Sequence, residues 1–392
     1  MVKQKKSNEE EMHSFKSIKV IDSGKSIILQ RNNDTSVRYH STWLRDNALD
    51  PKTRDVNNRQ RLITLSDVPI NISIQSAKLD KTGTNIFLTF LPEKKDLSFS
   101  ANWLEAHAYD TKQHNEKGWI APDLKMWGKD MSKNIPNVDY ESAKSDKTLL
   151  LQWLKSLYCY GFAKMTGGKI KSGALIQIAD LFGYVRETNY GKWFEVRSEI
   201  NAINLAYTNL GLQAHTDNPY RDPVPTIQIL YCLENSASGG DSTLVDGFNA
   251  AIHLKDKNSD YFNLLSKYCA RFEYNGDKGA HLQSRRPMIE LSPDGELIAI
   301  RFNNRSAAPI TDVPYEDMEN YYKAYRAFSD VINDSTLAVN FKLNPGECFI
   351  TDNTRVLHAR TAYSGTGTRW LQGCYVDKDG LLSTISTMSE KK

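Results

Sequence analysis

Short runs of apolar residues, separated by Asn, Asp, Gly and Lys, fill the first hundred positions of the chain. Runs of this length that are bounded by turn-forming residues are typical of β-strands rather than helices. The pattern therefore predicts a small β-rich domain over residues 1–110. Its expected strands are residues 18–22, 26–30, 61–65, 71–75 and 85–90.

The spacing of apolar residues changes after a polar, Gly- and Pro-containing connection at residues 111–139. Apolar residues then recur at helical spacing, which predicts an amphipathic helix over residues 146–158 with Ser145 as its N-cap. Further helices are expected at about residues 173–182 and 315–331.

Strand-like apolar runs dominate the rest of a second predicted domain, residues 140–392. They lie at residues 226–233, 243–246, 297–302, 347–351 and 370–376. Many short strands with few helices favour a β-sandwich or jelly-roll core. The predicted fold class is mainly β with helical buttresses, plus the small N-terminal β-rich domain.

Composition changes this picture little: 25% of residues are charged, 40% are hydrophobic, and the formal net charge is only +3. Basic and acidic residues are interspersed, so no nucleic-acid partner is expected. No run approaches the roughly 18 apolar residues of a membrane span, and the charged start of the chain is unlike a secretory signal. The five cysteines contain no CxxC pair, which argues against a disulfide framework. These features predict a cytoplasmic protein with no membrane partner.

The first chemical signal is the triplet His215-Thr216-Asp217, directly before an apolar strand run. Residues two apart in an extended segment point to the same side, so an imidazole and a carboxylate can converge on one ion. His358 lies just after another strand run. Two histidines and one carboxylate leave coordination positions open, as Fe(II) oxygenases require. A lone HxD triplet is, however, more often a surface turn.

Arg369, eleven positions after His358, is the second signal. A dicarboxylate co-substrate needs a fixed cation, and a guanidinium group offers a bidentate fork. Arg360 is a competitor for this role, but it lies beside the metal ligand and is expected to be too close. An arginine at a strand start is otherwise usually solvated or paired at the surface.

Several separated motifs stand out along the chain, namely YHSTWLRDN, RETNYG, NLAYTNLGLQAHTD, GGDSTLVDGFNAA, RFNNRS and DNTRVLHAR…TRWLQGCY. In this order they resemble the γ-butyrobetaine and trimethyllysine hydroxylases, within the taurine-dioxygenase-like superfamily of iron/2-oxoglutarate oxygenases. The resemblance covers most of the chain and implies a double-stranded β-helix (jelly-roll) core in residues 140–392. It also implies Fe(II) held by His215, Asp217 and His358, with 2-oxoglutarate and O2 as co-substrates. Arg369 would hold 2-oxoglutarate, and Ser242 would contact its other end.

One departure concerns zinc. The eukaryotic relatives bind zinc through cysteines just after WLRDN, whereas the first cysteine of this chain is Cys159. No structural zinc is therefore expected, and the small domain must be held together by packing.

The same resemblance implies aromatic residues around a quaternary ammonium group, at Tyr190, Phe194, Tyr207 and Tyr375. A trimethylammonium group cannot donate hydrogen bonds, so aromatic faces are its natural partners. Trp193 could supply a ring in place of Phe194, and the sequence leaves this register open. Each aromatic could also be an ordinary core residue.

The anionic end of the substrate is expected near Asn204 and Asn303, which match positions in the butyrobetaine enzymes. HTDNPY and FNNRS also resemble the 2-(trimethylammonio)ethylphosphonate dioxygenases. This second resemblance implies that the phosphonate is held by a set of neutral donors and one guanidinium, namely Asn218, Tyr220, Asn304 and Arg305. The competing interpretation pairs Arg305 with a local carboxylate such as Asp312.

The sequence thus predicts a dioxygenase that hydroxylates a methylene carbon of a small trimethylammonium zwitterion, with the phosphonate as favoured substrate. γ-Butyrobetaine and, less favoured, trimethyllysine are alternative substrates. A betaine-binding module without turnover is the alternative outside the enzymes. The resemblance to the family also implies a possible homodimer.

Overall fold

The computed structural model describes residues 13–110, 116–197, 211–276, 279–364 and 367–390. The chain divides into two compact units, residues 1–114 and 115–392. Among the helices of the described ranges, none is both long enough and apolar enough to cross a bilayer.

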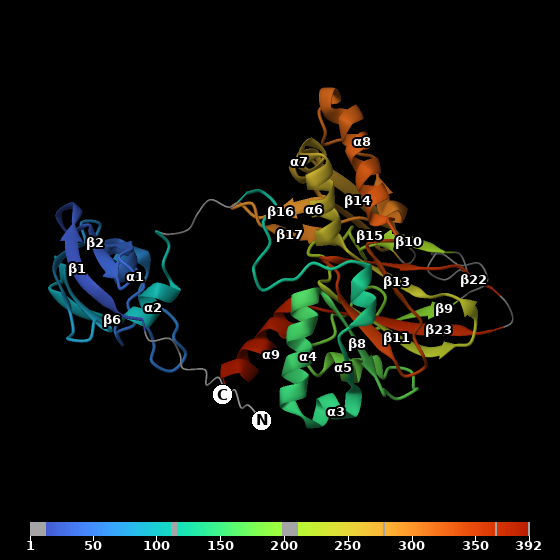
Figure 1. The fold of residues 1–392 in the computed structure, drawn as a ribbon, viewed down its shortest axis with the longest axis horizontal. Helices are drawn as coiled ribbons and strands as arrows, with labels where there is room; N and C mark the ends of the chain where they lie inside the picture. The colour runs from blue at the N-terminus through green and yellow to red at the C-terminus, as the bar shows by residue number, and fades with distance from the viewer. Residues whose placement is uncertain (1–12, 111–115, 198–210, 277–278, 365–366, 391–392) are drawn as a thin grey trace, which may run out of the picture. The chain divides into compact units, whose positions relative to one another are not determined.

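The first unit packs two three-stranded antiparallel sheets and two short helices around one apolar core (Figure 1). Side chains alternate along each strand: Ile86, Leu88 and Phe90 are buried, whereas Phe87 between them is exposed. One sheet has the order β1 (Phe15–Ile21), β2 (Ser26–Arg31), β3 (Ser36–His40), and the other β4 (Ser73–Leu79), β5 (Asn85–Leu91), β6 (Lys95–Ser100). The helices are α1 (Ser41–Asp46) and α2 (Ala101–Ala106).

Four of the five strands predicted in this unit are confirmed, as β1, β2, β4 and β5. The predicted strand at residues 61–65 is wrong, because the chain turns into a 3-10 helix at Leu65–Asp67. The Asp67 carboxylate accepts hydrogen bonds from the backbone and hydroxyl of Thr64, both at 2.8 Å. Such local side-chain bonds compete with a strand ladder. The sequence pattern missed β3 and β6, whose polar residues interrupt the apolar run.

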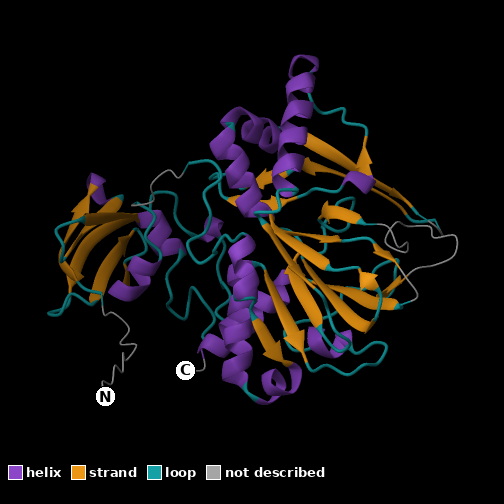
Figure 2. Ribbon diagram, turned by 45° about the vertical axis from the view of Figure 1, so that its right-hand side comes forward, coloured by secondary structure: helices purple, strands orange, loops and turns teal. Residues whose placement is uncertain are grey.

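The second unit is built on two antiparallel-dominated sheets that enclose an apolar core, as the jelly-roll prediction requires (Figure 2). The six-stranded sheet has the order β7 (Asn137–Asp139), β8 (Phe162–Thr166), β20 (Cys348–Asp352), β11 (Ile227–Asn235), β23 (Arg369–Val376), β9 (Phe194–Arg197). The four-stranded sheet has the order β10 (Leu212–His215), β21 (Val356–Arg360), β13 (Ser242–Asp246), β19 (Ala338–Phe341).

The central strand β11 is buried on both faces, which explains its almost continuous apolar sequence. Its odd-numbered residues Ile227, Ile229 and Tyr231 pack against the outer helices. Leu230 and Cys232 point the other way, into the core between the sheets. Gln228 shares this inner face and lines a pocket at one end of it.

Helices cover the outer face of the six-stranded sheet (Figure 1). They are α3 (Tyr140–Ser145), α4 (Lys147–Tyr160), α5 (Leu175–Ala179) and α9 (Lys378–Glu390). The predicted helix at residues 146–158 is confirmed as α4, but its N-cap is Asp146 rather than Ser145. The Asp146 carboxylate accepts from the backbone N–H groups of Thr148 and Leu149, whereas Ser145 ends α3.

A further layer packs beside the four-stranded sheet around its own apolar cluster. It contains α6 (Gly247–Lys257), α7 (Ser259–Lys267), α8 (Tyr315–Ile332), the sheet β15 (His281–Pro287), β14 (Cys269–Asn275), β18 (Ala307–Ala308), and the hairpin β16 (Ile289–Leu291), β17 (Leu297–Ile300). A small pair, β12 (Ser238–Gly239) with β22 (Tyr363–Ser364), completes the described strands. The predicted helix at residues 315–331 is confirmed as α8.

Candidate active site

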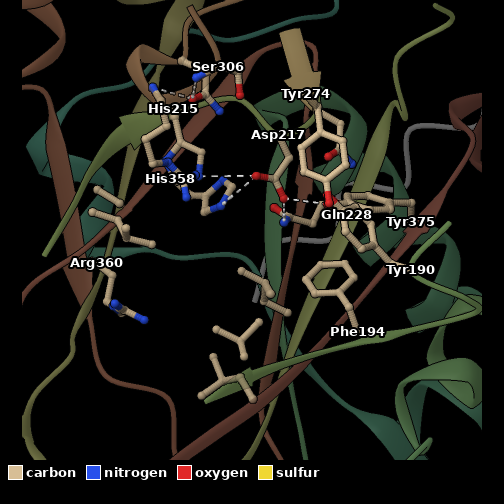
Figure 3. A pocket seen from close by; sticks show the side chains of 18 of the residues that line it. Tyr190, Phe194, His215, Asp217, Gln228, Tyr274, Ser306, His358, Arg360 and Tyr375 are labelled. Carbon is tan, nitrogen blue, oxygen red and sulfur yellow. Dashed lines mark hydrogen bonds and ion pairs between the residues drawn. The ribbon is translucent and has the colours of Figure 1, made fainter. Parts of the chain in front are cut away.

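Strand register brings the two histidines together. β10 and β21 are antiparallel neighbours, and His215 is the cross-strand partner of His358. Their ring centroids are 4.3 Å apart. Asp217 follows two residues after the end of β10, and its Oδ1 lies 3.3 Å from His215 Nε2 and 3.9 Å from His358 Nε2 (Figure 3). One ligand atom from each residue lies within 4.8 Å of the others.

The orientation of the histidines suits a metal. His215 Nδ1 lies 2.7 Å from the Gln213 carbonyl oxygen, which can only accept, so Nδ1 carries a proton and Nε2 is the nitrogen that faces Asp217. Burial, and then the neighbouring His215, lowers the pKa of His358 to about 3, so this imidazole is neutral. Burial alone would raise the pKa of Asp217, but its hydrogen bond with His215 and its interactions with the two histidines and with Arg305 reverse this and lower it. The donor set of two imidazoles and one carboxylate fits a ferrous ion.

Asp217 is held in place from both ends. Its Oδ2 accepts hydrogen bonds from Gln228 Nε2 at 2.5 Å and from the Tyr375 hydroxyl at 2.8 Å. Its backbone N–H donates to Asn353 Oδ1 at 2.7 Å, and its carbonyl accepts from Asn353 Nδ2 at 2.9 Å. Sequence reasoning missed Gln228 and Asn353. The available signal for Gln228 was a polar residue inside an otherwise apolar strand.

A cavity of about 450 Å³ opens beside these three residues, between the two sheets. Ser242, Arg360 and Arg369 line it together with His215 and His358. Figure 3 shows Arg360 on one side of the histidines and the aromatic side chains of Tyr190, Phe194 and Tyr375 on the other. Arg369, at the start of β23, is buried and donates from Nε to the Gly240 carbonyl at 3.2 Å. Ser242 is the first residue of β13 and pairs with Arg360 in the ladder.

Three of the predicted aromatic residues meet at one end of the cavity. The Phe194 ring centroid lies 5.3 Å from that of Tyr375 and 6.1 Å from that of Tyr190. Tyr274 joins this group, 6.0 Å from Tyr190 and 5.0 Å from Tyr220. Sequence reasoning missed Tyr274, because it lies on β14, outside the motifs. The predicted residue Tyr207 lies outside the described residues.

Of Trp193 and Phe194, between which the sequence leaves the register open, Phe194 lines the cavity. Trp193, in the bend just before β9, packs instead against the outer helical cluster. Phe194 pairs with Gly373 across β9 and β23. A Cβ atom at position 373 would lie 2.3 Å from the Phe194 ring, so glycine there is what allows the ring to sit in the pocket.

Asn218 presents an amide group to the cavity. It is buried, and its backbone adopts φ 52°, a conformation that asparagine tolerates better than most residues. The Tyr220 hydroxyl donates to Asn218 Oδ1 at 2.5 Å and lies 3.0 Å from the Tyr190 hydroxyl. Within the described residues Asn218 Nδ2 has no hydrogen-bond partner. Asn218 itself lines the cavity, and its amide nitrogen is buried in the cavity wall.

The residues predicted after β17 divide into two groups. Asn303 and Arg305 line the cavity, but Asn303 is committed to the backbone: its Oδ1 caps the turn at Asn304–Ser306 and its Nδ2 donates to the Thr216 carbonyl. Asn304 is exposed and does not line the cavity, because its amide bonds Gln213 and Tyr325 instead. The predicted residue Asn204 lies outside the described residues.

Asp312, the carboxylate that the competing interpretation pairs with Arg305, forms ion pairs with other arginines. Asp312 accepts from Arg271 at 2.5 Å and from Arg285 at 2.8 Å. Arg305 acts on the metal site through its charge, which lowers the pKa values of both Asp217 and His358, after the larger effects given above.

Comparison with known proteins agrees with this geometry. Residues 121–375 match the model of the "Taurine catabolism dioxygenase TauD, TfdA family". The chain is 34% identical over 348 residues to a γ-butyrobetaine dioxygenase of Pseudomonas sp. strain AK-1, covering 88% of this chain and 89% of that protein. It is 30% identical to the human γ-butyrobetaine dioxygenase (90% of this chain, 92% of that protein). It is 31% identical to a mitochondrial trimethyllysine dioxygenase of Gallus gallus (90% and 83%).

A solved structure of an asparagine oxygenase in complex with Fe(II), 3-hydroxyasparagine and succinate is also similar, at 18% identity and a TM-score of 0.48. The similarity covers 60% of this chain and 81% of that chain. The family match and the His/Asp/His cluster together argue against the alternative of a betaine-binding module without turnover. This chain belongs to the TauD, TfdA family, and it is a dioxygenase that uses Fe(II), 2-oxoglutarate and O2.

Proposed function

We propose that this dioxygenase hydroxylates a methylene carbon of a small trimethylammonium zwitterion, with 2-(trimethylammonio)ethylphosphonate as the favoured substrate. His215, Asp217 and His358 hold Fe(II) in this proposal, and Arg369 holds the distal carboxylate of 2-oxoglutarate with Ser242 nearby. When bound, the iron and its two co-substrates supply the oxidising chemistry. The protein's part is to orient one C–H bond toward the metal and to exclude water.

The observation that carries the proposal is the aromatic group around Phe194, next to the metal carboxylate. Phe194, Tyr190 and Tyr375 surround one end of the cavity with ring centroids 5.3–6.1 Å apart. A quaternary ammonium group has no N–H to donate, so it is attracted to ring faces and loses little by leaving water. Tyr375 also bonds Asp217, so a cation held here is close to the metal site.

The anionic end is the basis for preferring a phosphonate. Asn218 offers N–H donors whose orientation is fixed by Tyr220, and Arg305 adds a positive charge at the same cavity. A tetrahedral dianion has three acceptor oxygens and gains more from such donors than a planar monocarboxylate does. Asn304 lies outside the proposed anion site, since its amide bonds Gln213 and Tyr325.

γ-Butyrobetaine is the second candidate substrate, because the 34% identical Pseudomonas protein is a γ-butyrobetaine dioxygenase and is matched over most of its length. Trimethyllysine ranks third, on the strength of the avian protein. Both compounds share the trimethylammonium group with the phosphonate. The aromatic group around Phe194 alone therefore does not discriminate among the three substrates.

A substrate panel tests the proposal directly. Purified enzyme with Fe(II) and 2-oxoglutarate is given each of the three compounds, and both succinate and hydroxylated product are measured. We expect the highest kcat/KM with the phosphonate. A higher value with γ-butyrobetaine would end the phosphonate proposal, and no hydroxylated product from any of the three would end the trimethylammonium proposal as a whole.

The variant Asn218→Asp tests whether Asn218 binds the anionic end of the substrate. It keeps the side-chain size and the tolerance of positive φ but replaces two N–H donors by a carboxylate oxygen. Hydrogen bonds to a charged group contribute about 1.5–3 kcal/mol, which is roughly a ten- to hundredfold change. We expect the KM for the phosphonate to rise by at least that factor and the KM for γ-butyrobetaine to rise less. Equal changes for both would remove Asn218 from the anion site.

A further inference from the structure

The two carboxylate oxygens of Asp217 have different surroundings. Oδ1 faces His215 and His358, at 3.3 Å and 3.9 Å from their Nε2 atoms. Oδ2 faces away from them and accepts two hydrogen bonds, from Gln228 Nε2 and from the Tyr375 hydroxyl. Two donors occupy the in-plane lone pairs of a carboxylate oxygen. Oδ2 therefore has no lone pair left for a metal, whereas Oδ1 does.

The two donors come from one cross-strand pair. Gln228 on β11 is the direct partner of Tyr375 on β23, and both side chains point to the inner face of the six-stranded sheet. Asp217 itself belongs to the segment after β10, at the edge of the other sheet. The pair thus reaches across the cavity from the rigid centre of one sheet to a metal-site residue of the other.

Packing alone does not explain a glutamine at position 228. The side chain is 1% exposed, its neighbours along the inner face of β11 are Leu230 and Cys232, and within the described residues its Oε1 has no hydrogen-bond partner. A buried acceptor without a partner costs stability that an apolar residue of the same size would not cost. The contact that glutamine provides here is the N–H donated to Asp217.

We infer that Gln228 and Tyr375 are positioning residues that restrict Asp217 to coordination through Oδ1 alone. One-oxygen coordination keeps three positions on the metal open, enough for a two-point chelator and O2. Without the two donors, Oδ2 could turn toward the metal and occupy one of them. The inference rests on the proposed iron ligands, but it is independent of which substrate the enzyme hydroxylates.

Tyr375 has a second consequence. Its ring forms one wall of the aromatic group, 5.3 Å from the Phe194 ring, while its hydroxyl holds Asp217. A single side chain therefore connects the proposed cation site to the metal carboxylate. Tyr375→Phe separates the two roles, because it removes the hydroxyl donor and keeps the ring.

The test measures metal binding rather than turnover. Metal-free full-length protein is titrated with Co(II), without substrate, and both the dissociation constant and the visible absorption of the bound ion are recorded. Partners of metal ligands typically contribute ten- to a hundredfold to metal affinity. We expect Gln228→Met and Tyr375→Phe each to weaken Co(II) binding by about tenfold or more, and to change the absorption intensity that reports coordination number.

Gln372→Met is the matched control. Gln372 is also fully buried and lies on β23, but it bonds Glu195, Ser172 and Gly173 rather than Asp217. We expect it to lower the melting temperature without changing Co(II) affinity or absorption. The inference is overturned if Gln228→Met and Tyr375→Phe both bind Co(II) with unchanged affinity and absorption. It is equally overturned if Gln372→Met produces the same changes as they do.

His215→Ala separates this inference from the proposed iron ligands. If His215→Ala retains Co(II) binding at the cavity, the ligand assignment fails and the inference fails with it. If His215→Ala loses binding while Gln228→Met and Tyr375→Phe do not change it, the ligands stand and only the positioning role fails. A second readout is the ratio of 2-oxoglutarate consumed to product formed, which we expect to rise in both variants, since a misplaced carboxylate uncouples the two.

Discussion

Of the buried polar clusters in the second unit, the one around Arg355 and the one around Asp217 differ in how completely their atoms are bonded. Arg355 and Asp246 form the first: they are 1% and 0% exposed and make a two-point ion pair at 3.0 Å and 2.8 Å. The remaining Arg355 donors bond the carbonyl oxygens of Cys159 and Lys125. Asp246 also accepts from the backbone of Trp127 and Phe248.

The His215, Asp217 and His358 cluster is the second, and it is left incomplete. His358 Nδ1, Gln228 Oε1 and Asn218 Nδ2 have no hydrogen-bond partner within the described part of the chain. Both clusters carry the cost of desolvating polar groups, and the first offsets it more completely through bonds inside the protein. Complete bonding is typical of a structural cluster, whereas buried polar atoms without a protein partner are more frequent at functional sites.

The largest effect that separates the clusters should come from His215→Ala. We expect turnover to fall by more than about 10⁴-fold, which is more than roughly 5.5 kcal/mol of barrier, because the metal loses a ligand. The fold should remain, since the alanine variant keeps the backbone pairing of β10 with β21 and loses, outside the metal cluster, the side-chain hydrogen bond to Gln213. Succinate formation and a thermal unfolding curve measure the two quantities. Retained activity would contradict the metal assignment.

Arg355→Met should have the opposite effect, lowering mainly the free energy of unfolding. Removing the arginine leaves the Asp246 carboxylate buried without its counter-charge, and breaking such a pair costs about 3–5 kcal/mol. Urea unfolding of the metal-free enzyme measures this loss. The double variant Arg355→Met with Asp246→Asn should recover part of it, because no unpaired charge remains. A destabilisation below about 1 kcal/mol would show that the two clusters do not differ as described.

Phe194→Leu should have the smallest effect of the three variants. It tests substrate binding in the cavity next to the His215, Asp217 and His358 cluster. Leucine keeps an apolar surface but loses the ring face, so the KM for a trimethylammonium substrate should rise by about tenfold, or roughly 1–2 kcal/mol. A neutral analogue, with a tert-butyl group in place of the trimethylammonium group, serves as the control inhibitor. Its affinity should change less. Equal losses for the charged and neutral compounds would mean that Phe194 contributes only packing.

The fold and the metal site could be predicted from the sequence to a considerable extent. Strands such as β11 were visible because a strand buried on both faces needs an unbroken apolar run. The HxD triplet with His358 was visible because metal ligands must be specific residue types, and the family motifs carried them in the right order. The strand expected at residues 61–65 failed because local bonds from Asp67 outweighed its apolar residues.

The tertiary structure alone decided how the pocket is finished. Gln228 reaches Asp217 because β11 and β23 pair in one register, and Tyr274 reaches the aromatic group from a separate sheet. Asn304, adjacent to two cavity residues, turns outward. Sequence spacing determines which residues of a strand share a face, because side chains alternate along it. Which residues of different strands then meet depends on register and on the packing of sheets, and no local pattern encodes these.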